Sequence, residues 1–400
     1  MNLERLILLE ILVLGIIGVP LAMILGDSSY LYQYLFAHYY KEDVINSYLL
    51  LIYSITILVI FYNIFIKKKF ISYFDKPNII FTQQKYLRIW MISIFLALIC
   101  GVILFIQNSF THPLFSRDIF YSAYEFAFER QLTISRINPT IYNLGLHLFL
   151  PAAMFISIFY LKKTHIIVLT ICFFLLFATF SLAKSPIVDV IIQMFVLWLL
   201  VERKSYKLIK FFFIVLFILL VFILITSNAT SFNVIFNTLI ARLFVGEFGD
   251  LPSYFKLFHN QSASLLTLLP PYIQSFLGIN VSNLDPGKMV IEYTLYYQPR
   301  LLEIAGVANT FFIGTAYAYW GMIGVILSPV LVFLNFYVVV KLFKELPRNF
   351  FTIFLFGYLI YRLSASLSSG MSYFSTSGIQ IMILLVYLAK KNNLKFLYQA

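Results

Sequence analysis

Apolar runs long enough to cross a lipid bilayer recur along most of this chain, and they constrain its fold more than any other feature of the sequence. Each run has about 18 to 22 residues, which as a helix matches a hydrocarbon core roughly 30 Å thick. Hydrophobic residues make up 61% of the 400 residues and charged residues only 12%, whereas soluble domains are about a quarter charged. The runs lack the strict alternation of membrane barrel strands, so their backbone groups must be satisfied within helices. We therefore predict an all-α polytopic membrane protein.

The runs predict about ten transmembrane helices arranged around one large outer segment. Spans are expected near residues 6–26, 44–66, 88–107, 141–160, 165–183, 187–201, 208–226, 313–340, 350–368 and 373–389. One integral membrane domain then has a seven-span part (1–226) with an outer loop at 108–140, a long outer segment (227–312) and a three-span part (313–400). Short apolar stretches mixed with prolines in 227–312 favour short amphipathic helices on the membrane surface.

Basic residues cluster at the ends of alternate spans and predict the orientation of the chain. One side carries Arg5 and the clusters at 67–69, 76–88, 162–163, 203–210, 341–348 and 390–395, which together hold most of the 29 lysines and arginines. The positive-inside rule places this side in the cytoplasm, so both termini are predicted to be cytoplasmic and 227–312 to lie outside. The net charge of +12 comes from these anchors and leaves no basic face for nucleic acid, which we exclude as a partner.

The sequence shows no pattern for a bound metal or cofactor. The five histidines are scattered and never occur as a pair with ligand spacing. No glycine-rich phosphate loop and no nucleophile elbow is present, which argues against cytoplasmic nucleotide hydrolysis and serine-hydrolase chemistry. We expect neither a metal ion nor a cofactor.

A few charged residues need more explanation than solvation. Lys184 lies in a short turn between two predicted spans with Asp189 just over one helical turn later, an arrangement that suits an anion site or a structural lid. Arg362 lies in the outer half of a predicted span, where it either faces a partner inside the bundle or snorkels to the headgroups. Arg242 is followed by Gly246 and Gly249, which let a backbone approach a ligand closely, but a local salt bridge explains it equally.

The run from Ala308 to Gly324, AlaAsnThrPhePheIleGlyThrAlaTyrAlaTyrTrpGlyMetIleGly, leads from the long outer segment into a span. Together with the number of spans and the late outer segment, it resembles the O-antigen polymerase family, the Wzy-type polymerases of oligosaccharide repeat units. In that family an Asn-Thr pair, an acidic or aromatic stretch and Gly-x-x-Gly close the main loop. Arg242 followed by Gly246 and aromatic residues resembles the start of the same loop.

The resemblance implies a GT-C-like glycosyltransferase that acts on the outer face of a bacterial inner membrane. It would polymerise polyprenyl-pyrophosphate-linked repeat units of lipopolysaccharide O-antigen or capsule, without a metal ion or nucleotide sugar. Donor and acceptor are then both lipid-linked oligosaccharides, the carrier being undecaprenyl pyrophosphate. A chain-length regulator and a flippase are the expected protein partners, besides the membrane lipids.

The resemblance also implies roles for individual residues. Negative charge develops on the leaving pyrophosphate and calls for Arg or Lys nearby, and the acceptor hydroxyl needs a general base. The candidates for binding pyrophosphate are Arg242, Lys184, Arg136, Arg300 and Arg362. The candidates for the general base are Glu247 and Asp250, with His259 as an alternative. The chain departs from the family pattern in two places. Some family members carry Arg, then ten residues, then Gly in two outer loops, and neither Arg242 nor Arg136 has Gly at that spacing. Related ligases and polymerases often have Ser-Arg in the turn where this chain has Lys184-Ser185.

Two other functions fit the same architecture. An O-antigen-type ligase would transfer the glycan to a lipid A core or a protein, although the histidine expected in its outer-loop motif is not evident here. A flippase for the lipid-linked oligosaccharide is the alternative from a different class. Transporters usually have short loops and paired halves, whereas this chain has a long outer segment and no such symmetry.

Overall fold

The computed structural model describes the part of the chain that holds most of the predicted spans. It covers residues 17–26, 29, 32, 40–67, 73, 76, 78–109, 132–181, 185–202, 250–268, 277–278, 285–295, 311–368 and 379–392. These residues are mostly helical. The chain divides into two compact units: unit 1 comprises 1–76, 229–346 and 359–394, and unit 2 comprises 77–228, 347–358 and 395–400.

Five of the described helices are long and apolar enough to cross a membrane. They span Lys41–Ile66, Gln83–Gln107, Thr140–Leu161, Thr164–Ser181 and Phe312–Glu345. Two further helices carry shorter apolar segments, Asp189–Trp198 and Phe350–Ser364. The predicted all-α fold with several membrane helices is confirmed to this extent, whereas the count of about ten spans and the cytoplasmic position of both termini stay predictions.

Large apolar side chains lie exposed along these helices, as expected for surfaces that face lipid. On the helix from Gln83 to Gln107 they include Met91, Ile92, Phe95, Leu98, Val102 and Ile106. On the helix from Phe312 to Glu345 they include Met322, Ile323, Ile326 and Leu327. A monomeric protein in water rarely exposes apolar surface in such contiguous stretches.

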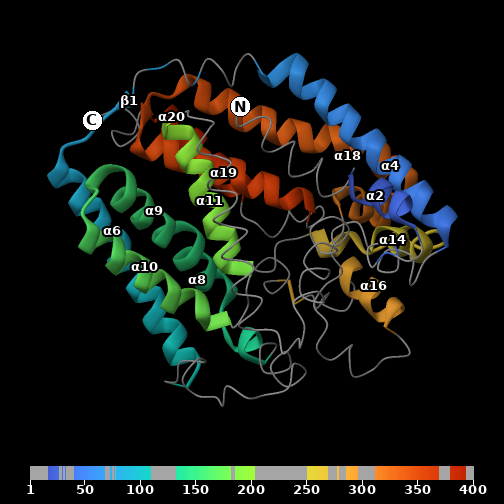
Figure 1. The fold of residues 1–400 in the computed structure, drawn as a ribbon, viewed down its shortest axis with the longest axis horizontal. Helices are drawn as coiled ribbons and strands as arrows, with labels where there is room; N and C mark the ends of the chain where they lie inside the picture. Colours follow the sequence, from blue (N-terminus) through green and yellow to red (C-terminus); the bar gives the residue numbers. More distant parts are fainter. Residues whose placement is uncertain are drawn as a thin grey trace. The chain divides into compact units, whose positions relative to one another are not determined.

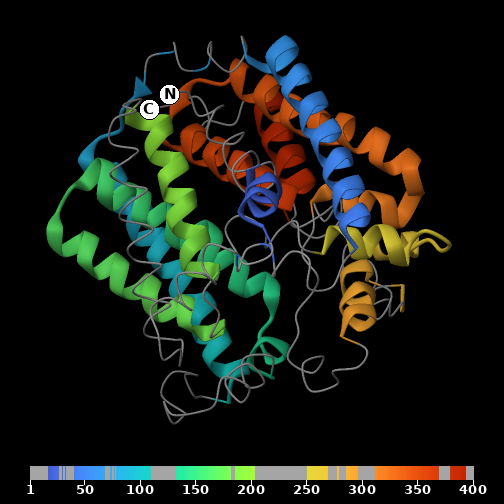
Figure 2. The same cartoon turned by 45° about the vertical axis from the view of Figure 1, so that its right-hand side comes forward.

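Unit 1 is built on the pair α4 (Lys41–Phe61) and α18 (Phe312–Glu345), which lie along each other (Figure 1). The rings of Phe61 and Phe65, at and just beyond the end of α4, pack against Phe333 with centroids 5.1 and 5.7 Å away. The short helices α14 (Leu251–Leu257) and α16 (Pro286–Thr294) pack against each other and against α18. Figure 2 shows α14 lying across the end of α4. Unit 1 also contains α2 (Gly18–Leu25) and α20 (Ile379–Lys391).

The helix α18 is broken at Gly321, so the expected continuous span 313–340 is wrong in this respect. Gly321 has φ 59° and ψ −146°, a conformation that only glycine adopts readily. Three residues later, an added Cβ on Gly324 would lie 2.1 Å from the carbonyl oxygen of Ala316. In a straight helix, residues 316 and 324 would be about 12 Å apart along the axis. Their close contact therefore shows that the chain turns back sharply at Gly321. The part before the break is buried, and the part after it exposes apolar side chains.

Unit 2 packs α6 (Gln83–Gln107) against a long composite helix and its neighbours. The composite helix comprises α8 (Pro139–Asn143), a π-helical segment (Leu144–Phe149), α9 (Leu150–Ile156) and a second π-helical segment (Ser157–Leu161). Beside it lie α10 (Thr164–Ala178), extended by Thr179–Ser181, and α11 (Ser185–Glu202). The helix α19 (Phe350–Ser368) belongs to unit 2 as far as Tyr358 and to unit 1 from Leu359.

Contacts within unit 2 join helix ends that the charge pattern places on the same side of the membrane. At the predicted cytoplasmic ends, the strands β1 (Asn78–Ile79) and β2 (Arg348–Asn349) pair in parallel. An Arg348 Nη atom donates to the Leu200 carbonyl at 2.6 Å. At the predicted outer ends, the Asn138 N–H donates to the Gln107 Oε1 at 3.0 Å. These contacts agree with helices that run alternately up and down.

The boundaries of the described helices agree with most of the predicted spans. The spans expected at 44–66, 88–107, 141–160, 165–183 and 350–368 correspond to helices that begin and end within a few residues of these limits. The helix α11 (Ser185–Glu202) likewise matches the span expected at 187–201, and α20 (Ile379–Lys391) matches the described part of the span expected at 373–389. The predicted span 208–226 and most of 6–26 lie outside the described residues.

A buried hydroxyl in unit 2 offers a test of this packing. The Tyr142 hydroxyl donates to the Ala178 carbonyl at 3.1 Å and lies 2.9 Å from the Ser181 Oγ, which ties the composite helix to the end of α10. We expect Tyr142→Phe to lower the free energy of unfolding by about 0.5 to 1.5 kcal/mol, measured by thermal unfolding in detergent. Tyr387→Phe, at an exposed tyrosine of α20, should change nothing; equal effects of both would contradict this packing.

Candidate functional site

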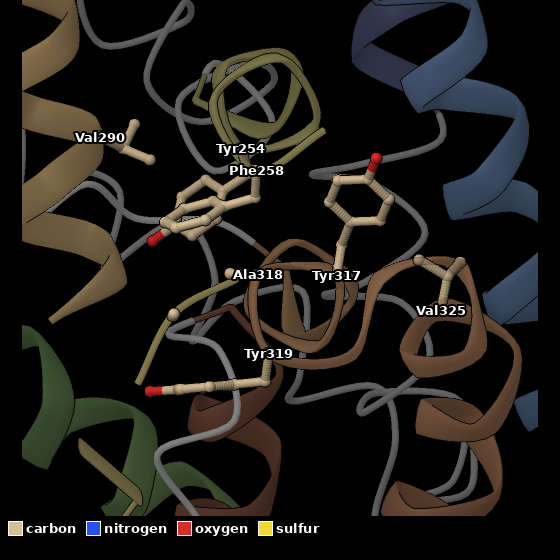
Figure 3. Packing of buried hydrophobic residues seen from close by; sticks show 8 residues of the cluster. Tyr254, Phe258, Val290, Tyr317, Ala318, Tyr319 and Val325 are labelled. Atoms are coloured by element: carbon tan, nitrogen blue, oxygen red, sulfur yellow. The ribbon is translucent and has the colours of Figure 1, made fainter. Parts of the chain in front are cut away.

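The broken end of α18 and the short helix α14 form a polar and aromatic cluster in unit 1. Its buried members include Tyr254 and Phe258 from α14 and its end, Tyr317 and Tyr319 from α18, and Val290 from α16 (Figure 3). In Figure 3 the hydroxyls of Tyr254 and Tyr319 point to one side of α18, whereas that of Tyr317 points to the other, toward α4. Both tyrosines of α18 belong to the Ala308–Gly324 run that resembles the polymerase family.

The break at Gly321 explains how this part of α18 is held against the segment that follows α14. In a regular helix the Ala318 carbonyl would accept a hydrogen bond from the N–H four residues later, beyond the break. Here it accepts instead from the N–H of Ala263 at 2.7 Å. The glycine therefore frees a backbone acceptor that fixes the segment after α14 to the motif.

Tyr254 lies at the centre of the cluster. Its side chain is only 2% exposed, and its hydroxyl hydrogen-bonds the side chain of Thr315. Burial raises the pKa of Tyr254 far above its usual value, and the carboxylates of Asp285 and Asp250 raise it further. Tyr254 therefore keeps its proton at neutral pH, and two acidic side chains lie close enough to act on it electrostatically.

The two carboxylates are placed by the starts of the two short helices. Asp250 immediately precedes α14, whose second residue is Pro252, and Asp250 is half-buried. Asp285 caps α16: its Oδ1 accepts from the N–H groups of Gly287 at 2.9 Å and Lys288 at 3.2 Å. Asp285 therefore has a structural role at the start of α16, and Asp250 is the one of these two carboxylates that the sequence predicts as a general base.

His259, the alternative general base, lies just beyond the other end of α14. Its side chain is exposed, and its Nδ1 lies 3.5 Å from the Tyr317 hydroxyl. Asp250 and the end of α14 at Phe258 are separated by about 12 Å along the helix. The structure therefore does not bring Asp250 and His259 together, and a single acceptor hydroxyl can use only one of them as its base.

Arg362 lies in α19, in the part that belongs to unit 1. The residue is half-buried, and its Nε is buried with no hydrogen-bond partner in the described part of the chain. A guanidinium within a membrane helix is expected to face a partner or an anion, because burying it unpaired costs about 2.5 to 3.5 kcal/mol on insertion scales. This environment matches the interior position that the sequence predicts as one of two alternatives.

Arg136 belongs to unit 2, and its side chain is exposed. It lies three residues before the start of α8, at the end that the charge pattern places outside. The remaining candidates, Arg242, Lys184, Arg300 and Glu247, lie outside the described residues. Their roles stay predictions.

Three residues of the cluster were not expected to belong to a site. Asp285 has a recognisable signature, because an aspartate before a proline is typical of a helix start. Thr315 and Tyr319 lie inside the motif, but their spacing alone does not show that they face Tyr254 rather than lipid. Among the described residues, no group of three or more His, Cys, Asp or Glu side chains that could hold a metal ion is present.

The Ala308–Gly324 run thus forms, from Phe311 on, a buried segment that ends in a glycine break. No model of a protein family, no curated protein and no solved structure matches the chain. The resemblance of this run to the O-antigen polymerase family therefore stays a prediction.

Ionisation of Tyr254 should limit stability at alkaline pH. Its pKa in the folded protein is raised above the unfolded value of 10.0, so this stabilisation is complete below about pH 10 and is lost as the pH rises further. We expect the free energy of unfolding in detergent to fall above pH 10 by up to about 1.4 kcal/mol per pH unit more in the wild type than in Tyr254→Phe. Tyr293→Phe, at an exposed tyrosine, should keep the wild-type slope. Identical slopes in the wild type and Tyr254→Phe would contradict the buried position.

Proposed function

We propose that this protein is a metal-independent glycosyltransferase that polymerises polyprenyl-pyrophosphate-linked oligosaccharide repeat units on the outer face of a bacterial inner membrane. Both termini are cytoplasmic in this proposal, and the cluster around Tyr254 faces the outside. The growing glycan moves from its lipid carrier to the sugar end of a second lipid-linked repeat unit. The bond to the donor pyrophosphate breaks, and a glycosidic bond to the acceptor hydroxyl forms.

The environment of Arg362 carries the proposal. A membrane helix that holds a guanidinium whose Nε is buried and has no hydrogen-bond partner among the described residues suits an anion delivered within the bilayer. A polyprenyl pyrophosphate is such an anion, since its apolar tail keeps the phosphates near the membrane. Charge accumulates on the pyrophosphate as the glycosidic bond breaks, so a fixed guanidinium stabilises the transition state more than the ground state.

The Tyr254 cluster supports the second half of the reaction. Asp250 is half-buried beside Tyr254, and a carboxylate in that position can accept the proton of the attacking hydroxyl. Tyr254 itself is too deeply buried to contact a substrate, and it instead fixes α14 to the motif through Thr315. The acceptor site is thus held by the residues that carry the family resemblance.

Deletion of the gene in its native bacterium tests the proposed function. A polymerase predicts that the ladder of long surface glycans collapses to a single repeat unit on the acceptor. Loss of all attached glycan, with long lipid-linked polymer accumulating outside, would indicate the ligase instead. Repeat units trapped on the inner face would indicate the flippase.

A further inference from the structure

The ends of α18 and α20 in unit 1 are joined by charged side chains at what the charge pattern predicts to be the cytoplasmic surface. The Lys390 ammonium of α20 forms an ion pair with the Glu345 carboxylate of α18. Lys76 donates to the Leu346 carbonyl at 2.7 Å, which satisfies a backbone acceptor at the end of α18. These two contacts bring three chain segments together at one place.

Lysines at this place outnumber acidic residues. Burial lowers the pKa of Lys76, while the charge of Glu345 raises it and that of Lys344 lowers it, so these groups lie within electrostatic reach of one another. Lys341 and Lys344 lie three residues apart on one face of α18, and both are exposed. With the exposed Lys391 of α20, the cluster of lysines keeps a positive charge that Glu345 does not neutralise.

Apolar side chains continue from these lysines into the membrane. On α18, Leu334 and Val338 are each 45% exposed and lie at helical spacing from Lys341. On α20, Leu384, Leu385 and Leu388 are exposed on the turns before Lys391. Both helices therefore present an apolar stripe that ends in lysine, and the Lys390–Glu345 pair holds the two charged ends together.

We propose that the lysine cluster, Lys76, Lys341, Lys344, Lys390 and Lys391, binds the headgroup of an anionic phospholipid. The phosphate lies against the ammonium groups and the acyl chains lie along the apolar stripes of α18 and α20. Basic groups between membrane helices on the cytoplasmic side bind anionic headgroups in this way. A soluble phosphate has no part that would use the apolar stripes, so a lipid fits both halves of the site.

Lipid binding to the purified protein in detergent tests the site directly. Phosphatidylglycerol is titrated and counted on the protein by native mass spectrometry, with phosphatidylcholine as the neutral comparison. We expect tighter binding of phosphatidylglycerol, and a loss of about fivefold in its affinity for each of Lys341→Gln and Lys344→Gln. The charge-conserving Lys341→Arg/Lys344→Arg variant should retain the wild-type affinity. Inorganic phosphate should not displace the lipid.

Lys162 and Lys163 provide the matched control, because they are exposed lysines at the predicted cytoplasmic end of a different helix pair in unit 2. Lys162→Gln/Lys163→Gln should leave the affinity for phosphatidylglycerol unchanged. A loss with Lys162→Gln/Lys163→Gln as large as that with Lys341→Gln or Lys344→Gln would show a general effect of charge and overturn the site. Displacement by inorganic phosphate, or equal binding of both lipids, would overturn it as well. None of these readouts depends on the proposed glycosyltransferase activity.

Discussion

Replacing Arg362 with alanine is expected to remove long surface glycan almost completely while leaving the fold intact. Loss of one charged group that stabilises a developing anion slows a reaction by about 10²–10³-fold. The buried Nε has no hydrogen-bond partner among the described residues, so we expect its removal to leave no buried acceptor unsatisfied. The deletion strain complemented with Arg362→Ala should therefore produce single repeat units from a protein that inserts and unfolds like the wild type.

Two variants give this expectation its controls. Arg362→Lys keeps the charge but loses the bidentate contact, so it should restore only part of the chain length. Arg88→Ala, at an exposed arginine of α6 near the predicted cytoplasmic surface, should restore the full ladder. A marked loss of thermal stability in Arg362→Ala with normal chain length in the surviving protein would show a structural ion pair and contradict the proposed role.

Among the glycines that the structure describes, Gly324 should tolerate an added side chain least. An alanine Cβ there would lie 2.1 Å from the Ala316 carbonyl oxygen and 2.7 Å from its carbon. Both are backbone atoms, so the two parts of α18 must separate for the new methyl group to fit. We expect Gly324→Ala to lower the free energy of unfolding by about 3 kcal/mol or more, measured by thermal unfolding in detergent.

Gly101 in α6 is the matched control for this substitution. Its added Cβ would lie 3.6 Å from the Phe177 ring, an ordinary contact, and alanine is a better helix former than glycine. Gly101→Ala should therefore be neutral or slightly stabilising. Similar stability of Gly324→Ala and Gly101→Ala would show that α18 does not turn back at Gly321.

The sequence predicts the membrane helices well because the bilayer sets their length. The helices at 83–107 and 164–181 were expected within a few residues of their observed limits, since apolar runs bounded by lysines leave little freedom. The same pattern does not reveal the break at Gly321, because the apolar run continues through it. The structure shows why both glycines are needed. Gly321 has a positive φ that other residues rarely adopt, and Gly324 leaves no room for a Cβ beside Ala316.

The candidate site was less predictable than the helices. Arg362 stands out in the sequence because a charge within an apolar run needs a reason. Tyr254 and Thr315 do not stand out, since their contact joins segments about sixty residues apart and depends on how α18 turns back. The acidic surroundings of Tyr254 also depend on the start of α16, which places Asp285 near α14. Local patterns carry no information on such contacts.

The length of the glycan made by the purified protein is the most direct test of polymerisation. Lipid-linked single repeat units from the deletion strain would be added to the protein in liposomes, with a chelator present and no nucleotide sugar. Polymerisation predicts a ladder of lipid-linked glycans that grows with time and is absent with Arg362→Ala. Repeat units that stay at their original length with the wild-type protein, whether or not they cross the bilayer, would contradict it.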